Sequence, residues 1–355
     1  MRVLVAGHDG YIGTVLVPVF QEAGHEVTGL DCGWYRECTF GAPPPDVPAI
    51  WKDVRQATIE DLRGFDAVVH LASISNDPVG DLNPDATMDV NLRGTVLLAR
   101  VAKQAGVPRF LFSSSCSLYG AAGDDILSED AEFNPVTPYG WSKIRAEEEL
   151  SQLADDGFSP TYLRNATAYG VSPRLRGDLV VNNLTGYAVS TGEVLLKSDG
   201  ETWRPLVHIE DISRAFLALT EADRSLVHDE AFNVGRSDEN YRISDVARIV
   251  GDAVEGSRIA FADHAGSDPR NYRIDCRKIE AVPGFEPVWT VPAGVEQLVA
   301  AYRDVGLTRE DLEGPRLSRI RHVRDLIEQG QLDEMLRWQG PTPVDTDEES
   351  TEMLN

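Results

Sequence analysis

Short apolar runs alternate with amphipathic stretches through the first half of the chain. The runs predict strands over Val3–Ala6, Glu26–Leu30, Ala67–Leu71, Phe110–Ser113 and Ser159–Leu163. The stretches between them predict helices over Ile12–Ala23, Thr87–Ala105 and Tyr139–Ala154. Strands that alternate with helices of this length form βαβ units. We therefore expect an α/β fold with a doubly wound parallel sheet of the Rossmann type.

The pattern changes near Ser172, which predicts a second, smaller C-terminal lobe for a substrate. We expect a first domain over residues 1–171 with a return segment at about 206–235, and the lobe over residues 172–205 and 236–300. Inside the lobe we expect helices over Val180–Thr191 and Ile243–Val254 and a strand near Val194–Lys197.

The chain continues beyond this lobe into a helical extension over residues 301–340. Leu317, Ile320, Val323 and Ile327 recur at helical spacing and predict an amphipathic helix over Ser318–Gln329. The extension could cover the substrate lobe or mediate assembly. Residues 341–355 are acidic and without periodicity, which predicts a disordered tail.

Composition and charge exclude several classes of protein. The 355 residues are 42% hydrophobic and 26% charged, which is ordinary for a globular protein. No apolar run approaches the ~20 residues of a membrane helix, and the N-terminus has no signal-peptide pattern. A net charge of −25 repels nucleic acid and anionic lipid, so a phosphate site must be built locally from arginines and helix N-termini.

The cysteines carry a further expectation. Cys32, Cys38, Cys116 and Cys276 have neither the paired spacing of a zinc site nor a dense disulfide pattern. We therefore expect a reduced, cytoplasmic protein without a metal site.

A glycine-rich loop follows the first predicted strand and opens the first helix. Its glycines let the chain turn sharply and let a pyrophosphate approach the positive end of that helix. Because a strand precedes the loop and a helix follows it, the motif predicts dinucleotide binding. The candidate contacts are Gly7, Gly10, Tyr11, Ile12 and Gly13.

Asp31 ends the second predicted strand, where a carboxylate can accept hydrogen bonds from both ribose hydroxyls of an adenosine. A 2′-phosphate would be repelled there, so Asp31 favours NAD over NADP. Asp53 and Val54 are placed to contact adenine. Beside the expected path of the cofactor, at the end of another strand, lie Leu71, Ala72 and Ser73.

Tyr139 and Lys143 are four residues apart and therefore share one face of a helix. A phenol has an ordinary pKa of ~10, and a neighbouring ammonium favours its ionised form. A serine-rich strand end precedes this helix. Period-two alternation puts Ser113, Ser115 and Ser117 on one face, and Ser114 and Cys116 on the other. Ser115 can hold a substrate hydroxyl or carbonyl beside Tyr139.

Together these motifs resemble the extended short-chain dehydrogenases, and more narrowly the NAD-dependent sugar-nucleotide epimerase/dehydratase family. The resemblance covers roughly residues 1–300 and rests on the glycine loop, Asp31, His70-Leu71-Ala72, the serine run ending in Tyr119-Gly120, and the Tyr139/Lys143 pair. It implies bound NAD and a catalytic set of Ser115, Tyr139 and Lys143. It also implies a place for Asn91 near the active site.

The resemblance implies a nucleoside-diphosphate sugar as the substrate. Arg204 and Arg270 match arginines that bind the substrate diphosphate, and Asn182 and Asn183 match a contact to the sugar nucleotide. The segment Asn165-Ala166-Thr167 departs from the family pattern of aromatic residues followed by Asn, which leaves the sugar contact at Thr167 open. On the serine face, Ser113 is expected to lie beside the cofactor. The expected substrate contacts are Ser115, Ser117, Thr167, Asn182, Asn183, Arg204 and Arg270.

The implied reaction is epimerisation through transient oxidation, at C4, followed by return of the hydride. The alternatives are a dehydratase or a 4-ketoreductase of the same family, and a non-catalytic NAD-binding regulator. Family dehydratases carry an Asp-Glu pair directly after the catalytic hydroxyl residue, where this chain has Cys116 and Ser117. The family also pairs two helices of each subunit, here about Thr87–Ala105 and Tyr139–Ala154, so a homodimer is expected.

Overall fold

A computed structural model describes residues 1–75, 77–266 and 270–340. A seven-stranded sheet with the order β11-β7-β5-β4-β1-β2-β3 forms its centre, and every neighbouring pair is parallel. The strands are β1 (Arg2–Ala6), β2 (Glu26–Asp31), β3 (Ala49–Trp51), β4 (Ala67–His70), β5 (Arg109–Ser115), β7 (Ser159–Asn165) and β11 (Glu230–Val234). This sheet confirms the predicted doubly wound fold.

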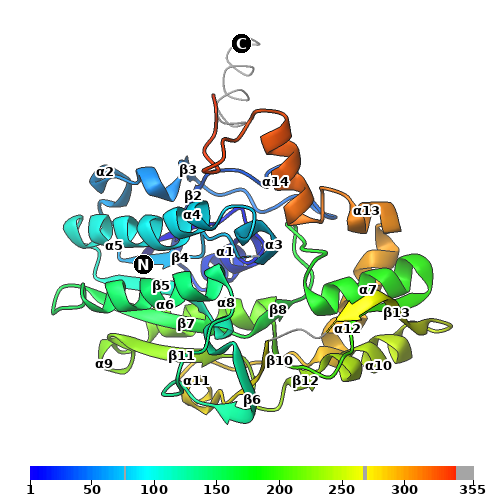
Figure 1. The fold of residues 1–355 in the computed structure, drawn as a ribbon. Helices are drawn as coiled ribbons and strands as arrows, with labels where there is room; N and C mark the ends of the chain where they lie inside the picture. Colours follow the sequence, from blue (N-terminus) through cyan, green and yellow to red (C-terminus); the bar gives the residue numbers. More distant parts are fainter. Residues whose placement is uncertain (76, 267–269, 341–355) are drawn as a thin grey trace.

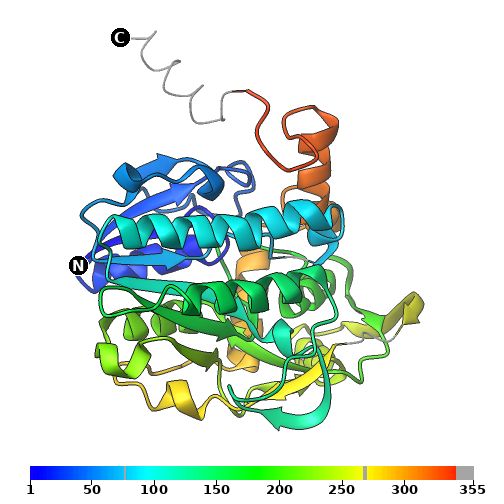
Figure 2. The same cartoon turned by 60° about the vertical axis from the view of Figure 1, so that its left-hand side comes forward.

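Helices cover both faces of the sheet. On one face α1 (Gly13–Glu22) packs beside α8 (Ile209–Glu221). On the other face α5 (Thr95–Gln104) and α6 (Pro138–Ser151) lie side by side, as Figure 2 shows. Because both faces are covered, β1 is a continuous apolar run in which Val3, Leu4, Val5 and Ala6 are fully buried. The central strands are therefore readable from sequence without any alternation.

Short strands and longer helices form the lower part of the molecule in Figure 1. Its strands are β6 (Ala121–Leu127), β8 (Thr167–Tyr169), β9 (Glu193–Ser198), β10 (Trp203–His208), β12 (Asn240–Arg242), β13 (Arg258–Gly266) and β14 (Asn271–Ile274). They pair as β12-β10-β8, β13-β9 and β14-β6. The helices α7 (Val180–Thr191), α10 (Ile243–Ala253) and α12 (Val291–Asp304) share a second apolar core with β9 and β10.

Two predicted elements need correction. The helix expected over Thr87–Ala105 is α4 (Pro84–Met88), a π-helical turn over Asp89–Gly94, and then α5. Asn91 lies in that turn, and its side chain bonds the backbone of Ile74, a long-range tie that no helical periodicity reveals. In the return segment, β10 joins the three-stranded sheet, whereas α8 packs on the central sheet and β11 pairs with β7 as its edge strand.

The remaining short elements connect these layers. They are the 3-10 turns Val54–Gln56 and Cys116–Tyr119, and the helices α2 (Ile59–Leu62), α3 (Asp77–Gly80), α9 (Arg224–Val227) and α11 (Arg277–Glu280). Within the described residues, no helix is long and apolar enough to cross a membrane.

The C-terminal extension spans both parts of the molecule. Helix α13 (Arg309–Glu313) packs on α7, with Leu312 filling the space beside Gly177 and Gly186. Helix α14 (Arg319–Glu328), close to the predicted Ser318–Gln329, lies above α13 in Figure 1 and packs on α3. The extension therefore reaches well past the substrate lobe. The predicted tail over residues 341–355 lies outside the described residues.

A buried ion pair joins α6 to the central sheet. Arg164 on β7 donates from Nη2 to Oε2 of Glu147 on α6 at 2.7 Å, and both side chains are more than nine-tenths buried. Glu147 also accepts from the Ser114 hydroxyl on β5. This pair therefore helps to set α6 at its place beside the ends of β5 and β7.

We expect Glu147→Gln to lower the free energy of unfolding by about 3 kcal/mol, because it leaves the Arg164 guanidinium buried without a carboxylate. Urea unfolding measures the change. The matched control is Glu148→Gln, one residue further on α6, where an exposed pair with Arg145 (3.4 Å) contributes less than ~1 kcal/mol. Equal losses in the two variants would contradict a special role for the buried pair.

Candidate active site

A cavity of about 680 Å³ opens at the carboxyl ends of the central strands. Its wall takes residues from the ends of β1, β2, β4 and β5, and continues to β9, β10 and the start of α7. Ligands of doubly wound sheets bind in this crevice, where the strand order reverses. The predicted catalytic and cofactor residues, except Asn91, lie in its lining.

The glycine loop forms one wall of the cavity, through Gly7, Gly10, Tyr11, Ile12 and Gly13. Gly7 has a φ of 91°, which L side chains rarely adopt. A Cβ on Gly13 would lie 2.2 Å from the carbonyl oxygen of Gly7, so the first turn of α1 tolerates no side chain there. No acidic residue occupies that first turn, so its positive end is available to an anion.

A segment of the second lobe holds this loop in place. Arg174 forms a buried ion pair with Asp9, with Nη2 at 2.8 Å from Oδ1, and Tyr11 donates to the carbonyl of Gly170 at 2.8 Å. The Ser172 hydroxyl lies 2.9 Å from that of Thr14. Burial and the nearby Asp31 raise the pKa of Asp9, and Arg174 opposes that shift. Sequence reasoning had placed Arg174 only in the second lobe and missed this role.

The predicted adenosine end is lined by Asp31, Asp53 and Val54. Asp31 accepts from the backbone N–H of Gly33 at 2.8 Å and of Asp9 at 3.2 Å, which fixes the carboxylate at the end of β2. The Asp53 carboxylate is held by Arg55 at 2.5 Å. Leu71, Ala72 and Ser73, after β4, line the same stretch.

Ser115, Tyr139 and Lys143 line one stretch of the cavity. The Thr137 hydroxyl accepts from the N–H of Gly140 and so begins α6 just before Tyr139. Lys143, one turn further, donates to the carbonyl of Ser113 at 2.7 Å, and its Nζ lies 5.5 Å from the centre of the Tyr139 ring. The helix therefore brings the ammonium to the phenol, as the four-residue spacing predicts.

Burial lowers the pKa of Lys143 to about 7, against a smaller opposing effect of Glu147. The side chain is 2% exposed and stands over the Phe112 ring at 4.6 Å, so a charge there loses most of its hydration. With a pKa of about 7, Lys143 readily gains or loses a proton near neutral pH.

The serine run does not continue as a strand to Ser117. Strand β5 ends at Ser115, a 3-10 turn follows, and the N–H of Ser117 donates to the Ser115 hydroxyl at 3.1 Å. Ser113, Ser115 and Ser117 all line the cavity, as does Ser114. Cys116 is fully buried, and its thiol donates to the carbonyl of Arg164, so it points away from the cavity as the alternation predicts.

The far end of the cavity is lined by Thr167, Asn183, Arg204 and Arg270. Arg204 on β10 is 5% exposed and donates to the carbonyls of Trp203 and Arg270. The two arginines are thereby brought together from distant parts of the chain. A pair of guanidinium groups at one end of a cavity is suited to a diphosphate.

Two predicted contacts lie behind the cavity wall. Asn91 is absent from the lining, since its amide bonds both the N–H (2.8 Å) and the carbonyl (3.0 Å) of Ile74. Asn182 accepts from the N–H of Gly170 at 3.0 Å and donates to the carbonyl of Arg176 at 3.0 Å, again outside the lining. Both asparagines shape the wall through hydrogen bonds to the backbone, and their contacts to the cofactor and the sugar nucleotide stay predictions.

Several buried polar atoms in the lining have no hydrogen-bond partner among the described residues. They are the hydroxyls of Ser73, Ser117 and Thr202, Oδ1 of Asn165, and Nη1 of Arg319. Unsatisfied groups in a cavity are costly without a ligand, so this set fits a polar, dinucleotide-sized occupant. Sequence reasoning singled out Thr167 and not Asn165 in the segment Asn165-Ala166-Thr167, and Arg204 and not Thr202 two residues earlier. It missed Arg319 because the segment around it carries no recognisable motif. No cluster of metal-ligating side chains occurs in the described part of the chain.

Comparison with known proteins gives one consistent result. A model of the NAD dependent epimerase/dehydratase family matches residues 3–235. A UDP-glucose 4-epimerase of Corynebacterium glutamicum is 29% identical over 307 residues, covering 82% of this chain and 92% of that protein. UDP-glucuronic acid decarboxylase 1 of Xenopus tropicalis is 26% identical over 312 residues, covering 85% of this chain and 72% of that one.

Among solved structures, MoeE5 in complex with UDP-glucuronic acid and NAD superposes with a TM-score of 0.73 at 26% identity. The match covers all of that chain but 86% of this one. MoeE5 shares the fold of this chain, and the names of these proteins span more than one reaction.

The depressed pKa of Lys143 predicts a pH-dependent stability for the cofactor-free protein. Between the native pKa of about 7 and the unfolded value of ~10.4, the unfolded chain binds more protons, so stability rises with pH. We expect the stability of the wild type relative to Lys143→Met to increase by about 1.4 kcal/mol per pH unit across this window. Urea unfolding at several pH values between about 7 and about 10 measures it. Lys278→Met, outside the cavity, is the control, and a pH-independent difference for Lys143→Met would contradict the assignment.

Proposed function

Because this chain belongs to the NAD-dependent epimerase/dehydratase family, we propose that it is an epimerase of nucleoside-diphosphate sugars. The proposed reaction inverts C4 by transient oxidation and return of the hydride, without net redox change. The relatives include 4-epimerases and decarboxylases, so the choice among reactions rests on the residues of this cavity.

NAD is the cofactor of this family, and when bound it supplies the acceptor and donor of the hydride. Residues along the cavity are suited to hold the successive parts of NAD. The glycine loop and the N-terminus of α1 would hold the diphosphate, and Asp31 the adenosine ribose. Lys143, between the Ser113 carbonyl and Tyr139, would hold the nicotinamide ribose.

The proton chemistry falls to three side chains. Tyr139 takes the proton of the sugar hydroxyl and later returns it to the same oxygen, which makes it both base and acid. Ser115 donates a hydrogen bond to that oxygen and keeps it beside the phenol. The Lys143 ammonium, 5.5 Å from the ring centre, favours the ionised phenol.

The choice of reaction rests on the positions of the carboxylate groups in the cavity lining. Among the described residues, the acidic side chains in the lining are Asp31, Asp53 and Asp178. Asp53 is paired with Arg55 and Asp178 with Arg176, and Asp31 ends β2. Elimination of water needs an acid and a base at the reacting sugar, and Cys116 and Ser117 supply neither. Removal and return of a hydride needs only Tyr139, Ser115 and the cofactor.

The proposed substrate end lies at Arg204 and Arg270, which would hold the diphosphate, with Thr167 and Asn183 toward the sugar. The keto sugar must then present its other face to the hydride, which requires a cavity wall without groups that lock one orientation. The small side chains of Ser115, Ser117 and Thr167 are compatible with that rotation.

The proposed assembly is a homodimer formed through α5 and α6. These helices lie side by side on one outer face (Figure 2). Each carries an exposed large apolar side chain, Leu97 on α5 and Trp141 on α6. Burial of such a pair against a second copy would form the four-helix packing expected for this family.

Product analysis separates the candidate reactions. The protein is incubated in deuterated water with UDP-glucose and UDP-glucuronic acid, and products are followed by NMR and mass spectrometry. We expect the C4 epimer with unchanged mass and no solvent deuterium. Loss of water would establish a dehydratase, loss of carbon dioxide a decarboxylase, and stoichiometric consumption of added NADH a ketoreductase; each would overturn the proposal.

We expect Tyr139→Phe to reduce turnover more than a thousandfold while NAD binding changes little, because the phenol oxygen acts only in proton transfer. Steady-state kinetics and the NAD content of the purified protein measure the two effects. The matched control is Tyr241→Phe, a half-buried tyrosine outside the cavity lining whose hydroxyl contacts Glu239. Activity of Tyr139→Phe above a tenth of wild type would remove Tyr139 from the role of base.

A further inference from the structure

The C-terminal extension packs against the side of the cavity that is lined by Asp31 and Asp53. A loop follows α14 and returns on itself, with an isolated bridge between Leu332 and Trp338. The indole N–H of Trp338 donates to the carbonyl of Cys32 at 2.7 Å, directly after β2. On α14, Nε2 of His322 lies 2.6 Å from the carbonyl of Trp34. We call residues 319–338 the C-terminal clasp.

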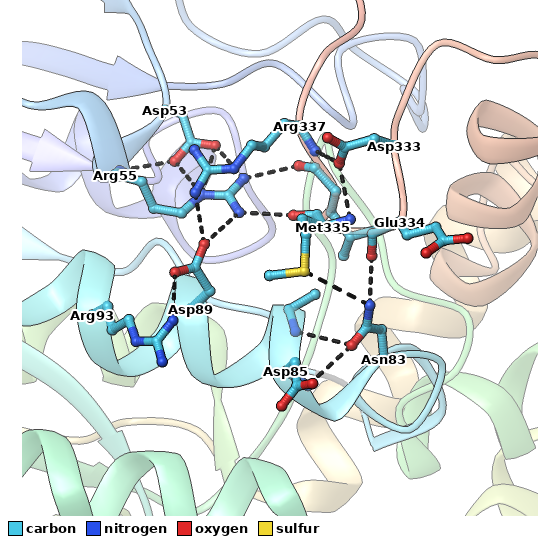
Figure 3. Close-up of polar contacts among 12 residues, drawn as sticks. Asp53, Arg55, Asn83, Asp85, Asp89, Arg93, Asp333, Glu334, Met335 and Arg337 are labelled. Carbon is cyan, nitrogen blue, oxygen red and sulfur yellow. Dashed lines mark hydrogen bonds and ion pairs between the residues drawn. The ribbon is translucent and has the colours of Figure 1, made fainter.

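Polar contacts tie the clasp to the adenosine wall, as Figure 3 shows. Arg55, which holds Asp53, also donates to the carbonyls of Met335 (2.7 Å) and Leu336 (2.9 Å). Arg337 pairs with Asp89 at 2.7 Å, and Asn83 donates to the carbonyl of Glu334 at 2.7 Å. The loop is thus bonded to the segments that carry Asp53 and α4.

An apolar cluster lies beneath these bonds. Clasp residues pack in it against the segments 32–35, 74–79 and 86–90, which also contribute lining residues to the cavity. The buried members are Trp34, Ile74, Val79, Ala86, Val90, Val323, Leu326, Leu332 and Leu336. Displacing the clasp would therefore expose an apolar surface and loosen the cavity wall together.

The clasp also places a charged side chain in the cavity. Arg319 begins α14, is 4% exposed and lines the cavity. Its Nη2 donates to the carbonyl of Arg174 at 2.8 Å, and its guanidinium stands 3.9 Å from the centre of the Tyr35 ring. Its Nη1 is buried and has no hydrogen-bond partner among the described residues. Burial lowers the pKa of Arg319, against smaller opposing effects of Tyr35, Cys38 and Asp178.

We propose that the C-terminal clasp completes the NAD site: the guanidinium of Arg319 binds the cofactor diphosphate, and the clasp fixes the adenosine wall so that NAD is retained between turnovers. The observation that favours an anionic ligand is a buried guanidinium group in the cavity lining that forms no ion pair with the described residues. A planar guanidinium is suited to a diphosphate oxygen.

The neighbours of Arg319 favour the cofactor over the substrate as the source of that diphosphate. Arg319 donates a hydrogen bond to the carbonyl of Arg174, and the Arg174 side chain forms the ion pair with Asp9 of the glycine loop. The loop and the positive end of α1 form the cofactor side of the cavity. The substrate side has its own guanidinium groups, Arg204 and Arg270, which come from β10 and the segment before β14.

The test measures how fast NAD leaves the protein, with no sugar nucleotide present, so it does not depend on the epimerase proposal. Full-length protein is loaded with radiolabelled NAD and chased with unlabelled NAD, and retained label is followed with time. We expect Arg319→Gln to release NAD at least about tenfold faster, since Gln keeps a donor for the Arg174 carbonyl but loses the charge. We expect Trp338→Phe, which loses the bond to Cys32 and part of the packing of the indole ring, to release NAD about threefold faster.

Arg324→Gln is the matched control, because it removes the same charge from an exposed position on α14. We expect its release rate to equal that of the wild type. The second readout is urea unfolding of the NAD-free proteins, in which Arg319→Gln is no less stable than wild type, since it removes a buried charge that lacks a carboxylate. A structural arginine would instead lower that stability and leave release unchanged, which would overturn the proposal.

Binding of UDP to the NAD-loaded protein distinguishes the two possible diphosphates. We expect the affinity for UDP to be the same in wild type and Arg319→Gln. A tenfold weaker affinity for UDP with unchanged NAD release would assign Arg319 to the substrate and overturn the proposal. If Arg319→Gln fails to fold, Trp338→Phe decides, and its release of NAD at the wild-type rate would refute retention by the clasp.

Discussion

The buried pair between Asp9 and Arg174 is the contact on which the arrangement of the cavity depends. Asp9 lies inside the glycine loop, so the loop cannot be correctly placed unless the second lobe brings Arg174 to it. Tyr11, Thr14 and Ser172 repeat the same connection with neutral groups. A pair buried this deeply is costly to break, because either partner alone would be a buried charge. The glycine loop is therefore a shared structure of both parts of the chain, although its sequence motif is local.

The sequence predicts best where one physical requirement dominates a segment. Continuous burial makes β1 readable, and amphipathic spacing gives α7, α10 and α14 to within a residue or two at each end. The glycine loop and the Tyr139/Lys143 pair are readable because backbone space and helical spacing constrain them locally. The π turn at Asp89–Gly94 and the 3-10 turn after Ser115 are set by distant partners and by the end of a strand, which a local pattern does not contain.

The same distinction separates the site residues. Motifs place Asn91 and Asn182 near the cavity, but their amides bond backbone groups of Ile74, Gly170 and Arg176, so they shape the wall. Conversely, Thr202 and Arg319 line the cavity without any motif. Positive charge gathers there in a protein of net charge −25, at Lys143, Arg176, Arg204, Arg270 and Arg319. The net charge of the protein repels an approaching anion, and these cationic side chains attract it within the cavity.

The contact between Trp338 and Cys32 has a consequence for the order in which this protein folds. The two residues are 306 positions apart in sequence, and Arg55 reaches Leu336 across 281. During synthesis the central sheet can pair before the last helix has emerged from the ribosome, because chains fold from the N-terminal side as they are made. For that interval, the apolar side chains of Trp34, Ile74 and Val90 have no covering helix and can associate with other chains. A contact of such long range also closes late and slowly. The nascent chain is therefore most exposed to aggregation in the period between completion of β11 and the arrival of α14.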